Sequence, residues 1–205
     1  MVLDDLETRL QAALSRSLPG AEAQRRMAPH PRSDHEQKAQ VGVRRVAAVL
    51  ILIYASRGEP HLVLTVRKSD LPHHRGQVAL PGGEVEEGET LEAAALREAQ
   101  EEVGVPPADA RILGSLTPLH LSVSGFEVHP IVAVADRRPD LRGSDGEVAR
   151  LLEIPLAELV DARCVRVEDR VPFFALGGER VWGATAMILA EFLGLLGIRP
   201  EPGLG

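Results

Sequence analysis

GEVEEGETLEAAALREAQEEVGV, residues 83–105, is the segment from which most of the architecture of this chain can be inferred. Residues 90–103 are predicted to form a helix, because Thr90 is a suitable N-cap and Gly104 can end a helix in the left-handed conformation. Ala93 occupies the third position after the cap, so the capping box is incomplete. Ahead of the helix, Pro81-Gly82-Gly83 predicts a turn.

Three glutamates gather on one side of this predicted helix. At 100° per residue, Glu98, Glu101 and Glu102 share a sector about 100° wide. The residues of the neighbouring apolar stripe, which can pack on a sheet, are Leu96, Ala99 and Val103. A solvated acidic face is the common reason for such a cluster. Hard divalent cations such as Mg²⁺ bind carboxylate oxygens and water, so three carboxylates beside a glycine turn favour a metal site here.

The segments on either side of residues 83–105 mix strands and helices. The helices are predicted at 2–18, 90–103, 155–159 and 184–196, and the strands at 46–54, 61–67, 77–80, 111–121, 126–135, 165–175 and 180–182. The continuous apolar run 46–54 is typical of a strand buried on both faces. Residues 21–40 are polar and aperiodic, which predicts a loop or arm. We therefore expect an α+β fold, with a helix and polar arm at 1–40 and the main domain at 41–205.

Composition excludes several classes of protein. The 205 residues are 44% hydrophobic with a net charge of −7, which argues against a large nucleic-acid surface. A single cysteine, Cys164, excludes an internal disulfide framework and a multi-cysteine zinc site. No apolar run approaches the ~18 residues of a membrane span, and the acidic N-terminus lacks the basic region of a secretory signal. We expect a cytoplasmic protein without nucleic-acid or membrane partners, and no oligomeric state is predicted.

The spacing within residues 83–105 resembles the Nudix box, G-x5-E-x7-R-E-U-x-E-E-x-G-U, where U is a bulky apolar residue. The matching residues are Gly83, Glu89, Arg97, Glu98, Glu101, Glu102, Gly104 and Val105. Ala99, at the first U position, is a small departure that affects packing more than chemistry. The resemblance implies an α/β/α sandwich with a mixed β-sheet, in which the box forms a loop, a helix and a loop.

The same resemblance implies hydrolysis of a nucleoside diphosphate linked to another group, assisted by Mg²⁺ or Mn²⁺. Divalent ions would neutralise the diphosphate and lower the pKa of an attacking water. The catalytic residues implied by position are Glu101, Arg97 and Glu89, and the metal ligands are Glu98, Glu102, Glu101 and the carbonyl of Gly82. In this assignment Arg97 and Glu89 form a pair that orients the other glutamates. The general base stays open between Glu101 and a residue outside the box.

Residues 62–83, LVLTVRKSDLPHHRGQVALPGG, resemble the segment ahead of the box in Nudix enzymes that hydrolyse coenzyme A. That segment combines an L-L-T-x-R strand, a basic stretch and G-x3-F-P-G-G; here Val63 and Leu80 replace the usual Leu and Phe. The run VWGAT at 181–185 is similar to the W-G-x-T that opens the last helix of that subgroup. The implied substrate-binding residues are Arg67, His74, Arg75, Gln77 and Gly83. A 3′-phosphate beside the diphosphate requires more than one cationic contact.

The leading hypothesis is a metal-dependent coenzyme A diphosphatase that releases 4′-phosphopantetheine and adenosine 3′,5′-bisphosphate. One alternative keeps the chemistry and changes the substrate to ADP-ribose, a dinucleotide or a modified nucleoside triphosphate. Another is a non-catalytic nucleotide-sensing module, although such modules usually lose box glutamates that this chain keeps.

Several other residues receive weaker assignments. Trp182 is expected to be a core or packing residue, with stacking on a base as its alternative. His120 and His129 are expected to be structural, and Cys164 to be an inert apolar residue. Two further candidate acids after the strands are Glu147 and Glu153.

Overall fold

The computed structural model describes residues 2–29, 45–68, 76–121 and 124–201. The helices are α1 (Leu3–Leu14), α2 (Gly20–Arg25), α3 (Leu91–Val103), α4 (Leu156–Leu159) and α5 (Gly183–Leu195), with 3₁₀ turns at Pro107–Asp109 and Ala162–Cys164. The strands are β1 (Arg45–Ser56), β2 (Glu59–Arg67), β3 (Val78–Ala79), β4 (Gly82–Glu84), β5 (Arg111–Ser115), β6 (Leu119–Leu121), β7 (Phe126–Ala135), β8 (Val148–Pro155), β9 (Val165–Glu168), β10 (Val171–Leu176) and β11 (Glu179–Trp182).

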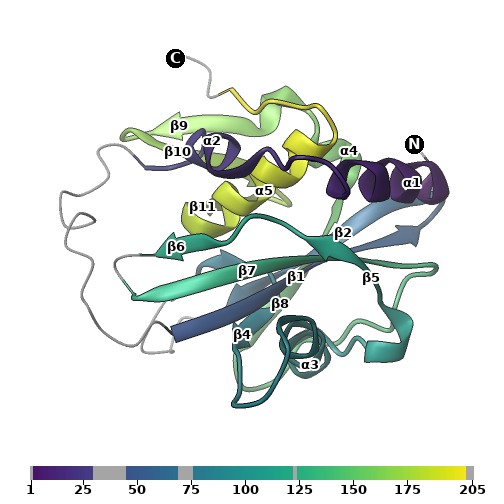
Figure 1. Cartoon of the computed structure of the whole chain (residues 1–205). Helices are drawn as coiled ribbons and strands as arrows, with labels where there is room; N and C mark the ends of the chain where they lie inside the picture. Colours follow the sequence, from purple (N-terminus) through teal and green to yellow (C-terminus); the bar gives the residue numbers. More distant parts are fainter. Residues whose placement is uncertain (1, 30–44, 69–75, 122–123, 202–205) are drawn as a thin grey trace.

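A mixed sheet lies between two layers of helix (Figure 1). Its main order is β3-β2-β1-β7-β5; in addition β4 pairs with β1, β6 with β7, and β8 with β2. Only the β1–β7 pair is parallel among the pairs of this sheet in the described residues. Helix α3 covers one face, whereas α1, α2, α5 and the second sheet, β11-β10-β9, lie on the other (Figure 1). The expected α+β class with a mixed sheet is therefore confirmed.

Strand β1 is the centre of the core, as its continuous apolar sequence predicted. Leu50 and Leu52 are fully buried on the α3 side, and Ile51 and Ile53 are fully buried on the α5 side. The β1–β2 hairpin turns through Arg57 and Gly58, both with positive φ, which matches the twist of the two strands. None of the described helices is long and apolar enough to cross a membrane.

Two predicted strands each form two shorter ones. The segment 111–121 breaks at 116–118, where the backbone N–H of Leu116 bonds to the carbonyl of Pro130, separating β5 from β6. The segment 165–175 reverses at Asp169 and Arg170, both with positive φ, which makes β9 and β10 a hairpin. Neither the break at 116–118 nor the reversal at 169–170 contains a glycine.

The sequence prediction missed β8 and misassigned two other segments. Strand β8 lies on β2 with several exposed side chains, so its sequence lacks a continuous apolar run. Helix α2 lies within a region predicted as a loop, of which residues 30–40 are outside the described part. The predicted Gly82-Gly83 turn is strand β4, which pairs with β1. A Cβ on Gly82 would lie 2.6 Å from Cα of Val49, so this position requires glycine. Glycine lets this strand approach the β1 backbone closely.

A buried carboxylate joins the N-terminal helices to the rest of the molecule. Glu191 of α5 is fully buried and accepts hydrogen bonds from the backbone N–H of Gly20 (3.1 Å) and of Thr117 (3.1 Å), and from Nε2 of Gln24 (2.8 Å). The α1 and α2 residues buried in the same apolar cluster as α5 or beside it are Leu3, Leu6, Leu10 and Ala23. Residues 2–29 are thus packed against the main sheet's α5 face.

Glu191→Leu should lower the free energy of unfolding by roughly 2–4 kcal/mol, because buried N–H groups without acceptors cost about 1–3 kcal/mol each. Urea unfolding followed by circular dichroism measures this change. The matched control is Glu22→Leu on α2, where the side chain is 77% exposed; surface changes of this kind stay within about 0.5 kcal/mol. Equal unfolding midpoints for the two variants would show that Glu191 does not stabilise the fold.

Candidate active site

Helix α3 begins and ends as its sequence predicts. Oγ1 of Thr90 accepts a hydrogen bond from the backbone N–H of Ala93 at 3.2 Å, and Gly104 ends the helix with φ of +77°. The helix packs on β1 and β4, so its side chains lie over the glycines of β4. Thr90 and Gly104 therefore set where α3 begins and ends, and with that which of its residues lie over β4.

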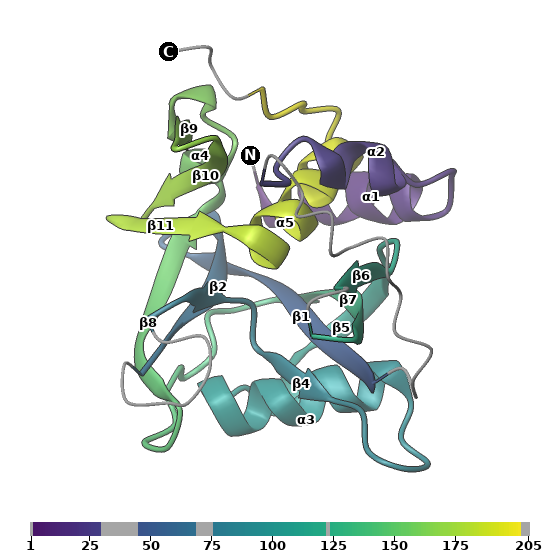
Figure 2. The ribbon, with the colours of Figure 1, turned by 90° about the vertical axis from the view of Figure 1, so that its left-hand side faces the viewer.

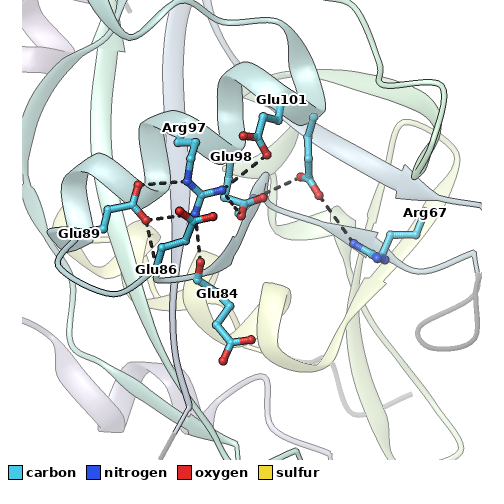
Figure 3. Close-up of polar contacts among 9 residues, drawn as sticks. Arg67, Glu84, Glu86, Glu89, Arg97, Glu98 and Glu101 are labelled. Carbon is cyan, nitrogen blue, oxygen red and sulfur yellow. Dashed lines mark hydrogen bonds and ion pairs between the residues drawn. The ribbon is translucent and has the colours of Figure 1, made fainter.

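Arg97 is the centre of a hydrogen-bond network that joins α3 to the loop before it (Figure 3). Its Nε and Nη2 donate to the two carboxylate oxygens of Glu89 at 3.0 and 3.1 Å, and Nη1 donates to Oε1 of Glu98 at 2.7 Å. Nη2 also donates to the backbone carbonyl of Glu84 at 3.1 Å, and Nη1 lies 3.5 Å from Oε2 of Glu101. The pKa of Arg97 is raised by its bonds to Glu89 and Glu98, and the pKa of Glu89 is lowered by Arg97.

The network orients one carboxylate and stiffens the loop before α3. Arg97 holds Glu98 on one side, while Glu89 also accepts a hydrogen bond from the backbone N–H of Glu86 at 3.2 Å. The contact from Arg97 to the Glu84 carbonyl could not be predicted from the sequence, because every residue has a backbone carbonyl.

Glu98 and Glu102 both lie against the glycines of β4. A Cβ on Gly83 would lie 2.5 Å from Cδ of Glu98, so only glycine leaves room for this carboxylate. Oε2 of Glu102 accepts a hydrogen bond from the backbone N–H of Gly82 at 3.2 Å. Glu101 points outward, with a side chain 60% exposed, compared with 17% for Glu98 and 9% for Glu102.

The buried face of α3 differs from the predicted one. Its buried residues are Ala94, Ala95, Ala99, Glu102 and Val103, while Leu96 is half-buried. The predicted apolar stripe is therefore displaced toward the carboxylates, and Glu102 belongs to the packed face. The small alanines next to it allow the helix to approach the sheet closely enough to bury a charged side chain.

Burial raises the pKa of Glu102 to about 7. The Gly82 N–H and Arg67 act in the opposite direction and lower this pKa, whereas Glu98 and Glu147 raise it. Removal of a carboxylate from water disfavours its charged form, which is the largest effect here. A buried carboxylate of this kind is stabilised by any cation that approaches it.

In the metal-free protein, the contribution of Glu102 to the free energy of unfolding should fall as pH rises from about 4.5 to about 7. The folded state holds the Glu102 proton more tightly than the unfolded state, so the contribution is fully present below the unfolded pKa and is lost above the folded pKa. Chemical unfolding in a chelating buffer at several pH values, for the wild type and Glu102→Gln, isolates this effect. The stability difference should change by roughly 2–4 kcal/mol across the window. A pH-independent difference would contradict it.

Arg67, at the end of β2, joins the site from the other side. Its Nη1 lies 3.7 Å from Oε1 of Glu102, and Nη2 donates to Oε2 of Glu147 at 3.1 Å. The Nε of Arg67 is buried and has no hydrogen-bond partner among the described residues. The backbone N–H of Arg67 bonds to the carbonyl of Gln77 at 2.9 Å. Arg67 thus ends β2, Gln77 directly precedes β3, which pairs with β2, and Gly83 belongs to β4, which pairs with β1. His74 and Arg75 lie outside the described residues.

The weaker candidates occupy different places. Glu147 lies at Arg67, but Glu153 accepts hydrogen bonds from Tyr54 and Arg138 and belongs to another cluster. Trp182 is 40% exposed, so the expectation of a core position is wrong. It lies at the end of β11, directly after the buried Val181.

The remaining three candidates lie among structural contacts. His120 and His129 each contact the carboxylate of Glu127 at 3.1 and 2.9 Å on β6 and β7. Cys164 is buried, and burial raises the pKa of its thiol to about 11, as expected for an unreactive cysteine.

The donor set suits a hard divalent cation. Glu98 and Glu102 supply carboxylate oxygens, Glu102 is a buried carboxylate whose charged form needs a cation, and Mg²⁺ requires only one or two carboxylates beside water and phosphate oxygens. No group of three His, Cys, Asp or Glu side chains converges to hold a metal ion by itself within the described ranges. These residues therefore fit an ion that is completed by water and substrate.

Comparisons with known proteins agree with this geometry. A family model described as the NUDIX domain matches residues 44–173. The chain is 41% identical over 166 residues to an uncharacterized Nudix hydrolase NudL of Citrobacter koseri, covering 77% of this chain and 85% of the relative. It is 40% identical over 179 residues to the protein of the same description from Salmonella typhimurium, covering 83% and 90%.

Two solved structures share the fold. A Nudix hydrolase from M. Smegmatis, RenU, superimposes with a TM-score of 0.55 at 20% identity and covers 75% of this chain and 86% of its own. A MutT protein from Methanosarcina mazei Go1 gives a TM-score of 0.51 at 19% identity and covers 75% and 94%.

Proposed function

This chain belongs to the NUDIX domain family, and from that premise we propose that it hydrolyses the diphosphate bond of coenzyme A with Mg²⁺ or Mn²⁺. The products would be 4′-phosphopantetheine and adenosine 3′,5′-bisphosphate. The observation that carries the proposal is the placement of Glu98 and Glu102 against Gly83 and Gly82, with Arg97 holding Glu98.

Each residue of the site has a proposed role. Glu98 and Glu102 bind the divalent ions, with the Gly82 carbonyl as an additional ligand. When bound, the ions neutralise the diphosphate and lower the pKa of the attacking water. Arg97 and Glu89 are positioning residues, since they act through Glu98 and the loop before α3. Glu101, the most exposed of the three box glutamates on α3, is the proposed proton acceptor or a further ligand.

The choice of coenzyme A rests on residues 62–83 and on the position of Arg67. Arg67 lies beside Glu102, where its guanidinium can contact a phosphate oxygen of the substrate. The carbonyl of Gln77 accepts a hydrogen bond from the backbone N–H of Arg67, and Gly83 belongs to β4. His74 and Arg75 are proposed as further contacts on the basis of the sequence pattern alone. The NudL relatives are described as uncharacterized, so they support the family and leave the substrate to experiment.

Product analysis by mass spectrometry tests this proposal. The protein is incubated with Mg²⁺ and coenzyme A, and in parallel with ADP-ribose. Adenosine 3′,5′-bisphosphate together with 4′-phosphopantetheine is the expected result. Release of AMP from ADP-ribose while coenzyme A survives would keep the diphosphatase chemistry and overturn the substrate. If a folded protein consumes neither compound with Mg²⁺ or Mn²⁺, the proposal fails.

A further inference from the structure

We propose that Trp182 is the surface on which the nucleobase of the substrate stacks. This inference deepens the proposed function and rests on it for the identity of the ligand, an adenine nucleotide. Trp182 is 40% exposed, and the other large hydrophobic residues exposed in the described part of the chain are Val2 and Val167. An exposed indole is the kind of side chain that a planar ligand can cover.

Strand register explains why this side chain faces outward. Trp182 pairs with Phe173 of β10, and the preceding Val181 pairs with Phe174. Val181 and Phe174 are fully buried in the core, so alternation places Trp182 and Phe173 on the opposite, outer face of the second sheet. The exposure of Trp182 therefore follows from the strand itself and is independent of a loose terminus or loop.

The end of β11 is fastened to the strand that leads into the candidate active site. Oγ1 of Thr185, three residues after Trp182, donates to the backbone carbonyl of Val78 at 3.1 Å, and this contact is buried. From Val78 the chain runs through Pro81 to Gly82, so this hydrogen bond joins the end of β11 to the segment that leads directly into β4. In Figure 2, β11 enters α5 on the side of the main sheet opposite α3.

The outer face around Trp182 combines aromatic and cationic groups. Arg166 pairs across β10 with Phe173, is exposed, and makes no ion pair or hydrogen bond with another described side chain. The guanidinium of Arg180 lies 4.5 Å from the centre of the Phe173 ring and also pairs with Glu168. Arg180 thus lies over the Phe173 ring, whereas the neighbouring Trp182 is exposed. A planar base that carries phosphate complements this surface in shape and charge.

The composition of the chain makes a direct measurement simple. Trp182 is its only tryptophan, so tryptophan emission reports on this side chain alone. The probe is adenosine 3′,5′-bisphosphate, added to the full chain without metal, and 4′-phosphopantetheine is the non-aromatic control. We expect saturable quenching and protection from acrylamide with the first compound and no change with the second.

The second test of the inference is the steady-state kinetics of Trp182 variants. Trp182→Ala should raise KM for the adenine nucleotide that the chain hydrolyses by about 5- to 100-fold, the range expected when stacking on one base is lost. The kcat should change by less than about twofold, because this contact is remote from the reacting bond. Trp182→Phe should restore most of the affinity. The matched control is Val167→Ala, an exposed apolar residue of the same sheet, whose KM should equal that of the wild type.

Three results would overturn the inference. The first is unchanged tryptophan emission at a concentration of adenosine 3′,5′-bisphosphate that inhibits turnover. The second is an unchanged KM for Trp182→Ala. The third is a tryptophan shielded from acrylamide without ligand in a dimer that dissociates on Trp182→Ala, because a second copy would then cover this face.

Failure of the proposed function is distinguishable from failure of this inference. If coenzyme A is not cleaved but the bisphosphate or ADP-ribose quenches Trp182, the stacking role stands and the substrate assignment fails. If coenzyme A is cleaved with no dependence on Trp182, only the stacking role fails.

Discussion

Glu98→Gln should lower kcat by about 10²- to 10⁴-fold, since a lost metal ligand removes several kcal/mol of transition-state stabilisation and each 1.36 kcal/mol is about tenfold in rate. Glutamine keeps the size of the side chain but removes the charge that a divalent cation requires. The Arg97 contact to Oε1 can persist, because an amide oxygen still accepts a hydrogen bond. The loss should therefore be confined to the chemistry, and steady-state kinetics with quantified products measure it.

The control for this variant lies on the same helix. Glu92 is exposed in the first turn of α3 and makes no ion pair with another described residue, so Glu92→Gln changes the net charge equally without touching the site. Its kcat should match that of the wild type. Near-normal turnover by a folded Glu98→Gln protein, verified by circular dichroism, would remove Glu98 from the metal site.

Gly83→Ala should abolish at least about 99% of activity while leaving the fold intact, which is a change of about 3 kcal/mol or more in the barrier. The added Cβ would lie 2.5 Å from Cδ and 2.7 Å from Oε2 of Glu98, so this carboxylate must move away. Because the obstructed group is the end of a flexible side chain, it can swing aside at little cost. The unfolding free energy should change by less than about 1 kcal/mol.

Two other glycines separate these effects. Gly82→Ala should destabilise the protein by about 1–3 kcal/mol or more, because its Cβ would press on the β1 backbone at Val49 Cα, which cannot move aside. Gly146→Ala meets no atom within 4 Å and should be neutral in activity and stability. Turnover by Gly83→Ala at the wild-type rate would mean that Glu98 works from a position other than the one against β4.

Elements whose signals are local could be predicted from the sequence. Strand β1 is continuously apolar, and α3 has its N-cap at Thr90 and its end at Gly104, so both were predicted within two residues of their bounds. The predicted strand 126–135 coincides with β7. In each case the neighbouring residues alone supply the hydrophobic pattern or the capping group that determines the element.

Elements that depend on a distant partner could not be predicted in this way. Strand β8 is exposed on much of one face and exists because β2 pairs with it. Strand β4 has two glycines and is a strand because β1 accepts it at close range. Helix α2 has six residues and is held by Glu191, which lies 167 positions from Gln24. Such elements are stabilised by packing rather than by propensity.

By itself, the sequence determined the family, the class of fold and the set of glutamates that α3 carries. Only the tertiary structure decided that Glu102 is buried beneath the helix, that Arg67 reaches it, and that Trp182 faces solvent. The physical reason is range. Caps and apolar periodicity act over a few residues, whereas burial and electrostatic coupling depend on which strands meet, and here β2, β4 and α3 approach each other from separate parts of the chain.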